Sequence, residues 1–246
     1  MDRITVGPSV FGGFVLCGKL PNKPAVFAHR GDWAQERENT IGAFRAAVES
    51  GADGIELDVR ITRDGRLVVH HDPLIEQVAV SRMIYPNIPE WIPSLTDALD
   101  ACYPLRVNIE IKVDDAASGS AVRTVEALNE LLRVRAEAPE NWVISSFDSR
   151  ALDHMRFLNS NFRLGLLCWK NPWQPSMEHA VSKGYSALHP HEGLVDAELI
   201  ESASAAGIEL CVWTVNDPKR ARGLAAAGVA SLITDVPAVI RNSLNV

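Results

Sequence analysis

The stretch AVFAHRGDWAQERENTIGAFRAAVESGADGIELD, residues 25–58, decides the fold class because two short apolar runs flank one helical segment. Ala25–His29 and Gly54–Asp58 have the length and composition of buried strands, and Thr40–Ser50 is an Ala-rich helical run. Asn39 or Thr40 can cap this helix, and Gly51 stands where it should end. A strand, a helix and a second strand predict an α/β protein with parallel strands.

The same alternation continues along the chain and gives eight strand candidates, which predicts a (β/α)8 TIM barrel. Residues 1–24 have an irregular composition, and residues 25–246 are expected to form one domain. The remaining strands are predicted at Arg106–Lys112, Trp142–Phe147, Arg163–Leu167, Ser186–His189, Glu209–Thr214 and Ser231–Thr234, with helices at Ala121–Ala136, Ser149–Phe157, Met177–Ser182, Val195–Ala206 (ended by Gly207), Pro218–Ala226 (ended by Gly228) and near Pro237.

One run breaks the alternation. Leu67–His71 follows the second strand too closely for a helix to lie between them, so we predict an antiparallel return strand outside the eight. If Asp64-Gly65 is a two-residue hairpin loop, Arg63 pairs with Arg66 and Asp58 lies opposite His71. A shift of one residue would place His70 there instead.

A short insertion, residues 73–105, follows this hairpin and makes the barrel irregular. Its larger apolar side chains can form a wall over a pocket, or they can pack on the barrel as a satellite core. Both interpretations remain open for Met83, Ile84, Tyr85 and Trp91.

The bulk composition narrows the function classes. Apolar residues make up 47% and charged residues 22% of the 246 residues, which argues against disorder. The formal net charge of -7 argues against a nucleic-acid partner, although a bound cation would still admit a phosphate substrate. No run is long enough to cross a membrane, and no signal peptide or stable membrane insertion is expected. The separated Cys17, Cys102, Cys168 and Cys211 predict reduced thiols in a cytoplasmic protein.

Polar side chains recur at the ends of successive predicted strands. His29 and Arg30 end the first strand, Glu56 and Asp58 end the second, and Glu110 and Lys112 end the third. In such barrels the carboxyl ends of the strands form the mouth where catalysis occurs, and the hairpin would bring His71 to the same place. Converging carboxylates repel, and a hard cation such as magnesium or calcium would relieve that repulsion.

From the residues alone, a purely structural role for these side chains is about as well supported as a metal site. A histidine at a strand end is often a hydrogen-bonded structural residue, and Glu-Leu-Asp is a weak signal. One of the glutamates could simply be the salt-bridge partner of Lys112 or Arg30. A metal site and a structural ion-pair network therefore both remain open at this point.

Four segments together resemble glycerophosphodiester phosphodiesterases of the phospholipase C-like phosphodiesterase superfamily. They are AHRGDWAQERENTIGAFRAAVESGADGIELDVRITRDGRLVVHHDP at 28–73, NIEIK at 108–112, VWTVND at 212–217 and LITDVP at 232–237. The resemblance runs from about Ala25 to Ala238 and implies an irregular (β/α)8 barrel. It also implies hydrolysis of small-molecule glycerophosphodiesters to sn-glycerol 3-phosphate and an alcohol such as choline or ethanolamine.

The resemblance assigns roles position by position. It implies that two histidines act as general acid and base, that three carboxylates bind the divalent cation, and that two cations contact the phosphate. It also implies that one tryptophan borders the pocket and that two residues support the first loop. In that order, these residues are His29 and His71; Glu56, Asp58 and Glu110; Arg30 and Lys112; Trp213; and Glu38 with Asn39.

Two departures from the family pattern accompany it: Arg37 stands where Pro is usual, and the insertion is shorter. The first nucleophile, a substrate hydroxyl or water, stays open, as do the alcohol, the metal and the oligomeric state. His189, His191, Trp169 and Trp173 could line the pocket or lie on the surface.

Three alternatives come from other classes. A phospholipase C-like or D-like lipid enzyme would need an apolar or basic rim, for which the loop Trp169–Trp173 is the candidate. A catalytically inactive barrel could serve as a binding module, but such a barrel would usually have lost a ligand or a histidine. An ordinary sugar-phosphate barrel enzyme would not need this arrangement of histidines and carboxylates.

Overall fold

The computed structural model describes residues 23–113 and 119–244, which form a closed barrel of eight parallel strands. The strands are β1 (Ala25–His29), β2 (Gly54–Ile61), β6 (Arg106–Ile111), β7 (Trp142–Ser146), β8 (Arg163–Cys168), β9 (Ala187–Pro190), β10 (Glu209–Val212) and β11 (Ser231–Thr234). The barrel closes because β1 pairs in parallel with both β11 and β2. The predicted TIM barrel and all eight of its strands are confirmed.

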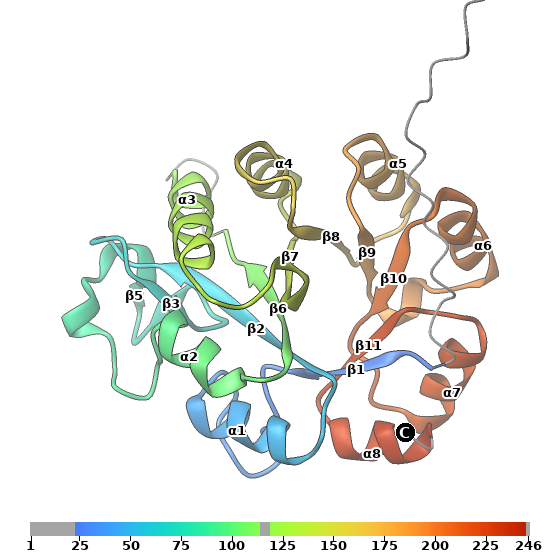
Figure 1. The fold of residues 1–246 in the computed structure, drawn as a ribbon, viewed down its shortest axis with the longest axis horizontal. Helices are drawn as coiled ribbons and strands as arrows, with labels where there is room; N and C mark the ends of the chain where they lie inside the picture. The colour runs from blue at the N-terminus through green and yellow to red at the C-terminus, as the bar shows by residue number, and fades with distance from the viewer. Residues whose placement is uncertain (1–22, 114–118, 245–246) are drawn as a thin grey trace, which may run out of the picture.

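Helices surround the barrel as a ring that follows chain order (Figure 1). They are α1 (Ile41–Glu49), α2 (Leu95–Cys102), α3 (Ser120–Arg133), α4 (Ser149–Leu158), α5 (Gln174–Ser182), α6 (Ala197–Ala206), α7 (Pro218–Ala226) and α8 (Pro237–Ser243). The Thr40 hydroxyl caps α1 by accepting from the Ala43 amide, and α6 ends at Gly207 with a φ of 68°, both as predicted.

Sequence reasoning missed α2, which lies inside the insertion. Its eight residues make only about two turns, too short for helical periodicity to be distinguished from a loop. The Ser94 side chain caps it by accepting from the Asp97 amide, and Leu95 and Leu99 are buried. With α2 in place, the connection from β2 to β6 has a helix like the other barrel connections.

The register of the hairpin differs from the prediction by one residue. β2 pairs with β3 (Leu67–Val69) so that Val59 lies opposite Val69. The residue opposite Asp58 is therefore His70, not His71, and the His70 backbone N–H donates to the Asp58 carbonyl at 3.0 Å. Thr62, not Arg63, pairs with Arg66, so the loop has three residues. The Thr62 hydroxyl causes this, because it donates to Asp64 Oδ1 at 2.6 Å and accepts from the Arg66 amide at 2.9 Å.

The insertion forms a satellite core beside the barrel. It contains β4 (Leu74–Ile75), β5 (Val78–Ala79) and two short 3-10 helices, Val80–Arg82 and Tyr85–Asn87. Met83, Tyr85 and Trp91 pack on a small buried cluster formed by Val68, Ile75, Val80 and Ile92. The satellite-core interpretation therefore holds for these three side chains.

Arg37, which stands where the family usually has proline, contacts the insertion. Its guanidinium carbon lies 3.2 Å from the ring centroid of Trp91, a cation–π contact that joins the first loop to the insertion. A proline would stiffen this loop internally, whereas Arg37 ties it to the satellite core.

Side chains along β2 alternate between the apolar core and the polar interior of the barrel. Ile55, Leu57 and Val59 belong to the main apolar core, while the intervening Glu56 and Asp58 are buried polar side chains.

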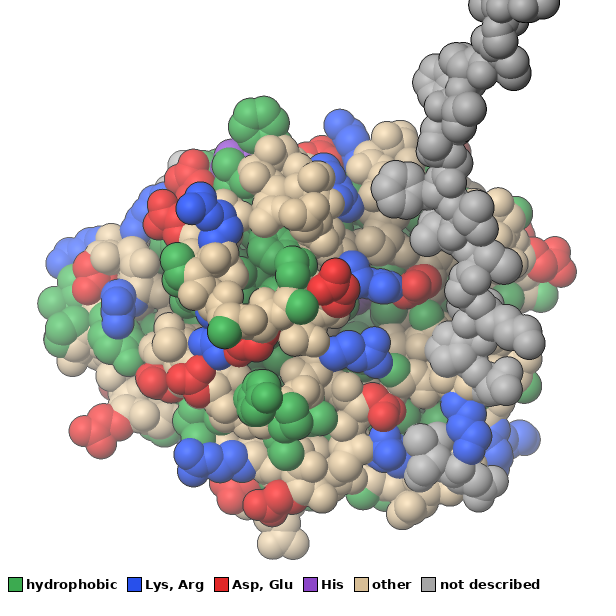
Figure 2. Space-filling view, in the orientation of Figure 1, with side chains coloured by type: hydrophobic (Ala, Val, Ile, Leu, Met, Phe, Trp, Pro, Cys, Tyr) green, Lys and Arg blue, Asp and Glu red, His purple; other side chains and the backbone are tan. Residues whose placement is uncertain are grey.

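Acidic and basic side chains are interspersed on the face of the molecule seen in Figure 2. Among the described residues, no helix combines the length and apolarity needed to cross a membrane.

The described cysteines, Cys102, Cys168 and Cys211, are buried free thiols. Cys17 and most of the predicted lead-in, residues 1–24, lie outside the described residues.

Candidate active site

A cavity of about 580 Å³ opens where the strands end. His29 is the last residue of β1, Lys112 and Phe147 directly follow β6 and β7, and Trp213 directly follows β10. The structure therefore brings together most of the predicted site residues at the carboxyl mouth of the barrel, as expected for this fold. The cavity is lined by His29, Arg30, Glu56, His71, Asn108, Glu110, Lys112, Phe147, Leu167, Trp169, Trp213, Thr214 and Ile233.

Three carboxylates converge beside this cavity: Glu56 and Glu110 line it, and Asp58 lies next to them. Glu56, Asp58 and Glu110 are 3%, 1% and 7% exposed, and each offers an oxygen within 4.8 Å of the others. Oxygens that bind one calcium ion at about 2.3–2.6 Å can lie up to about 5 Å apart, so this spacing fits a shared ion. Within the described part of the chain, Glu56 Oε1 has no hydrogen-bond partner, which leaves a buried acceptor for a cation.

The carboxylates carry different charges without a cation. Burial, and then repulsion from Asp58, raise the pKa of Glu56 to about 8, and the same two causes raise the pKa of Glu110. Burial also raises the pKa of Asp58, but Lys112 and Arg30 outweigh it and lower that pKa to about 2. Glu56 is therefore disposed to hold a proton until a positive charge replaces it.

The two basic side chains lie directly on this cluster. Lys112 Nζ is 2.6 Å from Glu110 Oε1 and 3.0 Å from Asp58 Oδ1. Arg30 Nε lies 3.3 Å from Asp58 Oδ2. Because both residues also line the cavity, they present positive charge to whatever the cavity holds.

Glu38 and Asn39 support these groups from the first loop. Arg30 Nη1 donates to both carboxylate oxygens of Glu38 at 3.0 Å. Asn39, which is 2% exposed, donates through Nδ2 to Asp58 Oδ2 at 2.7 Å. The backbone N–H of Asn39 also donates to the Arg30 carbonyl at 2.9 Å, so one short loop positions both Arg30 and Asp58.

His29 has a partner that sequence reasoning missed. Its Nδ1 lies 2.6 Å from Asp235 Oδ1, and its Nε2 lies 3.9 Å from Glu56 Oε2. Burial lowers the pKa of His29, but Asp235 and Glu56 outweigh burial, so the pKa is raised. Asn216 Nδ2 donates to the other Asp235 oxygen at 2.6 Å. The available signal was the position of Asp235 directly after the last strand, where barrel active-site residues are found.

His71 lines the cavity although the predicted register was wrong. β3 ends at Val69, so strand alternation does not govern the two following histidines. His71 Nδ1 lies 2.9 Å from Asp72 Oδ1, whereas the His70 ring contacts Trp91 edge-on with centroids 5.6 Å apart. Burial, and then Lys112 and Arg30, lower the pKa of His71 against the opposing effect of Asp58.

Aromatic side chains form another part of the cavity wall. The Trp213 ring meets Phe147 edge-on at 5.6 Å, and its Nε1 donates to the His189 carbonyl at 2.8 Å. Trp169 also lines the cavity, while Trp173 is a core residue at 5% exposure. His191 is exposed and lies edge-on to Trp213, with ring centroids 5.2 Å apart.

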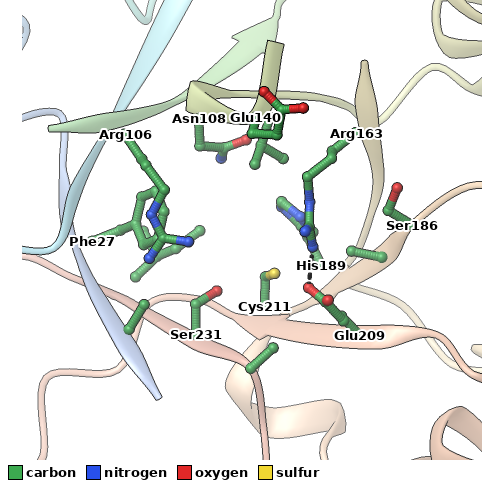
Figure 3. Close-up of a pocket in the computed structure, with 15 residues that line it drawn as sticks. Phe27, Arg106, Asn108, Glu140, Arg163, Ser186, His189, Glu209, Cys211 and Ser231 are labelled. Carbon is green, nitrogen blue, oxygen red and sulfur yellow. Dashed lines mark hydrogen bonds and ion pairs between the residues drawn. The ribbon is translucent and has the colours of Figure 1, made fainter. Parts of the chain in front are cut away.

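A second, smaller cavity of about 60 Å³ lies toward the start of the strands (Figure 3). Arg163 and Glu209 form an ion pair there, and Asn108 lines both cavities. The fully buried His189 ring points into this lower space. None of the three carboxylates lines it, whereas Glu56 and Glu110 line the larger cavity.

Known proteins share this architecture over nearly the whole chain. A glycerophosphodiester phosphodiesterase from Caldanaerobacter subterraneus is 32% identical, covering 89% of this chain and 97% of its own. A lysophospholipase D from Mus musculus is 27% identical, covering 89% and 85%. A phosphodiesterase from Oleispira antarctica, solved with the product sn-glycerol-3-phosphate, has a TM-score of 0.81 and 25% identity, covering 91% and 98%.

The profile of one protein family matches residues 29–84 and 78–239, which include every predicted site residue. The fold, the converging residues and this match agree: the chain belongs to the Glycerophosphoryl diester phosphodiesterase family.

Proposed function

We propose that this protein is a metal-dependent phosphodiesterase that hydrolyses glycerophosphodiesters to sn-glycerol 3-phosphate and an alcohol. The observation that carries the proposal is the buried carboxylate cluster at a cavity that two histidines also line, in a chain of this family. An inactive barrel used only for binding would have no need to keep Glu56, Asp58 and Glu110 together, because their burial is costly without a cation.

Glu56, Asp58 and Glu110 would hold the cation. The cluster offers only oxygen ligands, which favours a hard ion such as magnesium or calcium. A bound ion supplies positive charge that neutralises the phosphate and stabilises charge in the transition state. Arg30 and Lys112 are proposed to contribute to the same neutralisation from the cavity wall.

His29 and His71 are proposed to divide the proton transfers. Each has its Nδ1 beside a carboxylate, Asp235 for His29 and Asp72 for His71, which leaves Nε2 for the substrate. One imidazole would take a proton from the nucleophile and the other would protonate the leaving alkoxide. Their opposite pKa shifts favour different protonation states near neutral pH.

The remaining predicted residues would act through these groups. Trp213 is proposed to bound the organic part of the substrate, and Glu38 and Asn39 to keep Arg30 and Asp58 in place. The cytoplasmic location stays a prediction from the cysteines.

Product analysis tests the proposal. Purified protein is incubated with glycerophosphocholine, glycerophosphoethanolamine and glycerophosphoglycerol, with a chelator or with added magnesium or calcium. Release of sn-glycerol 3-phosphate only when a divalent cation is present is the expected result. Full turnover in a metal-free preparation, or no phosphodiester cleavage with any cation, would contradict it.

A second substrate class is favoured by one observation. Phe147 and Trp169 line the cavity and are nevertheless 44% and 60% exposed, so an apolar rim continues outward from the site. Such a rim suits the acyl chain of a lysophospholipid. Comparing lysophosphatidylcholine with glycerophosphocholine tests this: Trp169→Ser should selectively raise the KM for the lipid, and equal effects on both substrates would count against an acyl-chain role.

A further inference from the structure

Arg60 is a buried cation that the site described above does not use. It lies on β2 two residues beyond Asp58 and is 5% exposed. Its Nε donates to the carbonyls of His70 at 3.2 Å and His71 at 3.1 Å, and its Nη2 donates to the His71 carbonyl as well. A single guanidinium thus holds two successive carbonyls of the segment that carries His71.

We propose that Arg60 is a positioning residue that fixes the backbone of His71 and thereby aims its imidazole into the cavity. The inference rests on the proposed function, since it assumes that His71 takes part in proton transfer. It adds a residue that acts on the site through the main chain and that does not itself line the cavity containing His29 and His71.

The backbone of His71 needs such a support. The last ladder bond of the hairpin joins the His70 amide to the Asp58 carbonyl, and β3 has already ended at Val69. The His71 side chain is 35% exposed, and its neighbour on Nδ1, Asp72, is 69% exposed. Contacts between groups this exposed hold a side chain weakly. The buried Arg60 therefore connects His71 to the rigid barrel wall.

An arginine suits this task better than a lysine. Its planar fork presents several N–H groups in fixed directions, whereas a lysine ammonium is a single flexible point charge. Burial lowers the pKa of Arg60 to about 10, against Asp58 and Glu110, so it stays charged at neutral pH. A lysine at this position could reach one carbonyl and would leave the other without its present bonds.

Removing the clamp should impair turnover more than binding. A displacement of about 1 Å in a catalytic group can cost about 10²-fold in rate. We expect Arg60→Met to lower kcat on glycerophosphocholine by about tenfold or more, with KM changed by less than about threefold. Arg60→Lys should fall between this variant and the wild type.

Arg123 offers a matched control at the other end of the same hairpin. Its Nη2 donates to the carbonyls of Thr62 at 3.1 Å and Arg63 at 2.9 Å, also two successive residues. Arg123 does not line the cavity. If arginine–carbonyl bonds serve only to stabilise the hairpin, Arg60→Met and Arg123→Met should both lower the thermal stability and change kcat alike. We expect only Arg60→Met to change kcat.

Double-mutant cycles decide whether Arg60 acts through His71. Arg60→Met is combined separately with His71→Ala and with His29→Ala, and kcat is measured at high enzyme concentration with folding checked by circular dichroism. The Arg60 effect should disappear when His71 is absent and persist when only His29 is absent. Persistence of the effect in both backgrounds would overturn the inference, as would full turnover of Arg60→Met.

Different results would contradict the proposed diesterase function and the positioning role of Arg60. If Arg60→Met does not fold, Arg60→Lys carries the same cycles. Failure of the proposed function would appear in the wild-type protein as the absence of cation-dependent cleavage. Wild-type turnover in His71→Ala would remove the role that Arg60 is inferred to support, while leaving the diesterase activity established.

Discussion

Replacing Asp235 by Asn removes the carboxylate that holds His29. Asp235 Oδ1 lies 2.6 Å from His29 Nδ1, and the two residues are 206 positions apart in the chain. The substitution keeps the shape of the side chain but exchanges an anionic acceptor for a neutral amide. An amide that turns its NH2 toward Nδ1 would also favour the wrong tautomer of the imidazole.

The size of the effect follows from the bond that is lost. A hydrogen bond with a charged partner contributes about 1.5–3 kcal/mol. At about 1.4 kcal/mol per factor of ten, its removal corresponds to a loss of about 10- to about 150-fold in kcat/KM. Asp235 helps to raise the pKa of His29. In the variant, the limb of the kcat/KM pH profile that reports the protonation of His29 should therefore move to lower pH.

The assay is the pH profile of kcat/KM on glycerophosphocholine at saturating magnesium or calcium. Asp217→Asn serves as the control, because Asp217 caps α7 in the neighbouring loop by accepting from the Arg220 amide at 2.8 Å. Asparagine is also a good cap, so this variant should keep both its stability and its activity. Wild-type kcat/KM in Asp235→Asn, with an unmoved profile, would refute the proposed function of the His29–Asp235 pair.

Three further outcomes are expected. Metal affinity, measured by the cation-induced rise in melting temperature, should increase between about pH 6 and pH 8, because Glu56 must lose its proton to bind and its pKa is raised to about 8; a pH-independent affinity would speak against Glu56 as a ligand. His71→Ala should lose about 10²-fold or more in kcat, whereas His70→Ala, whose ring packs on Trp91, should lose mainly stability; the reverse pattern would exchange their roles. Gly165→Ala should lower the free energy of unfolding by about 1–3 kcal/mol, because the new Cβ would lie 2.2 Å from His189 Nε2; an unchanged melting temperature would show that the ring can move aside.

Most of the barrel was predictable because its signals are local. Each strand is a short apolar run, and each helix has its own periodicity and caps, such as Thr40 before α1. The helix α2 escaped because eight residues within an irregular insertion carry too little periodicity. The hairpin register failed for a different reason: the Thr62 side chain selected a three-residue loop through bonds that Asp64-Gly65 alone does not reveal.

Most members of the site were also visible in the sequence, because the barrel brings strand ends to one mouth wherever they occur in the chain. Glu56 and Asp58, two residues apart on one strand, had to share a face. Their role as metal ligands was one of two interpretations that the residues alone left open, and the family resemblance favoured it. That role, and the acid–base role that the resemblance implied for the histidines, remain proposals.

The sequence by itself determined the order of strands and helices and the residues that stand at the strand ends, since these depend on spacing within a few residues. Only the tertiary structure decided which side chains meet. Closure of β1 against β11 places Asp235 beside His29, and the end of β3 at Val69 allows Arg60 to hold the His71 segment. These contacts depend on the closure of the sheet and on where a strand stops, and neither is encoded in the periodicity of any single segment.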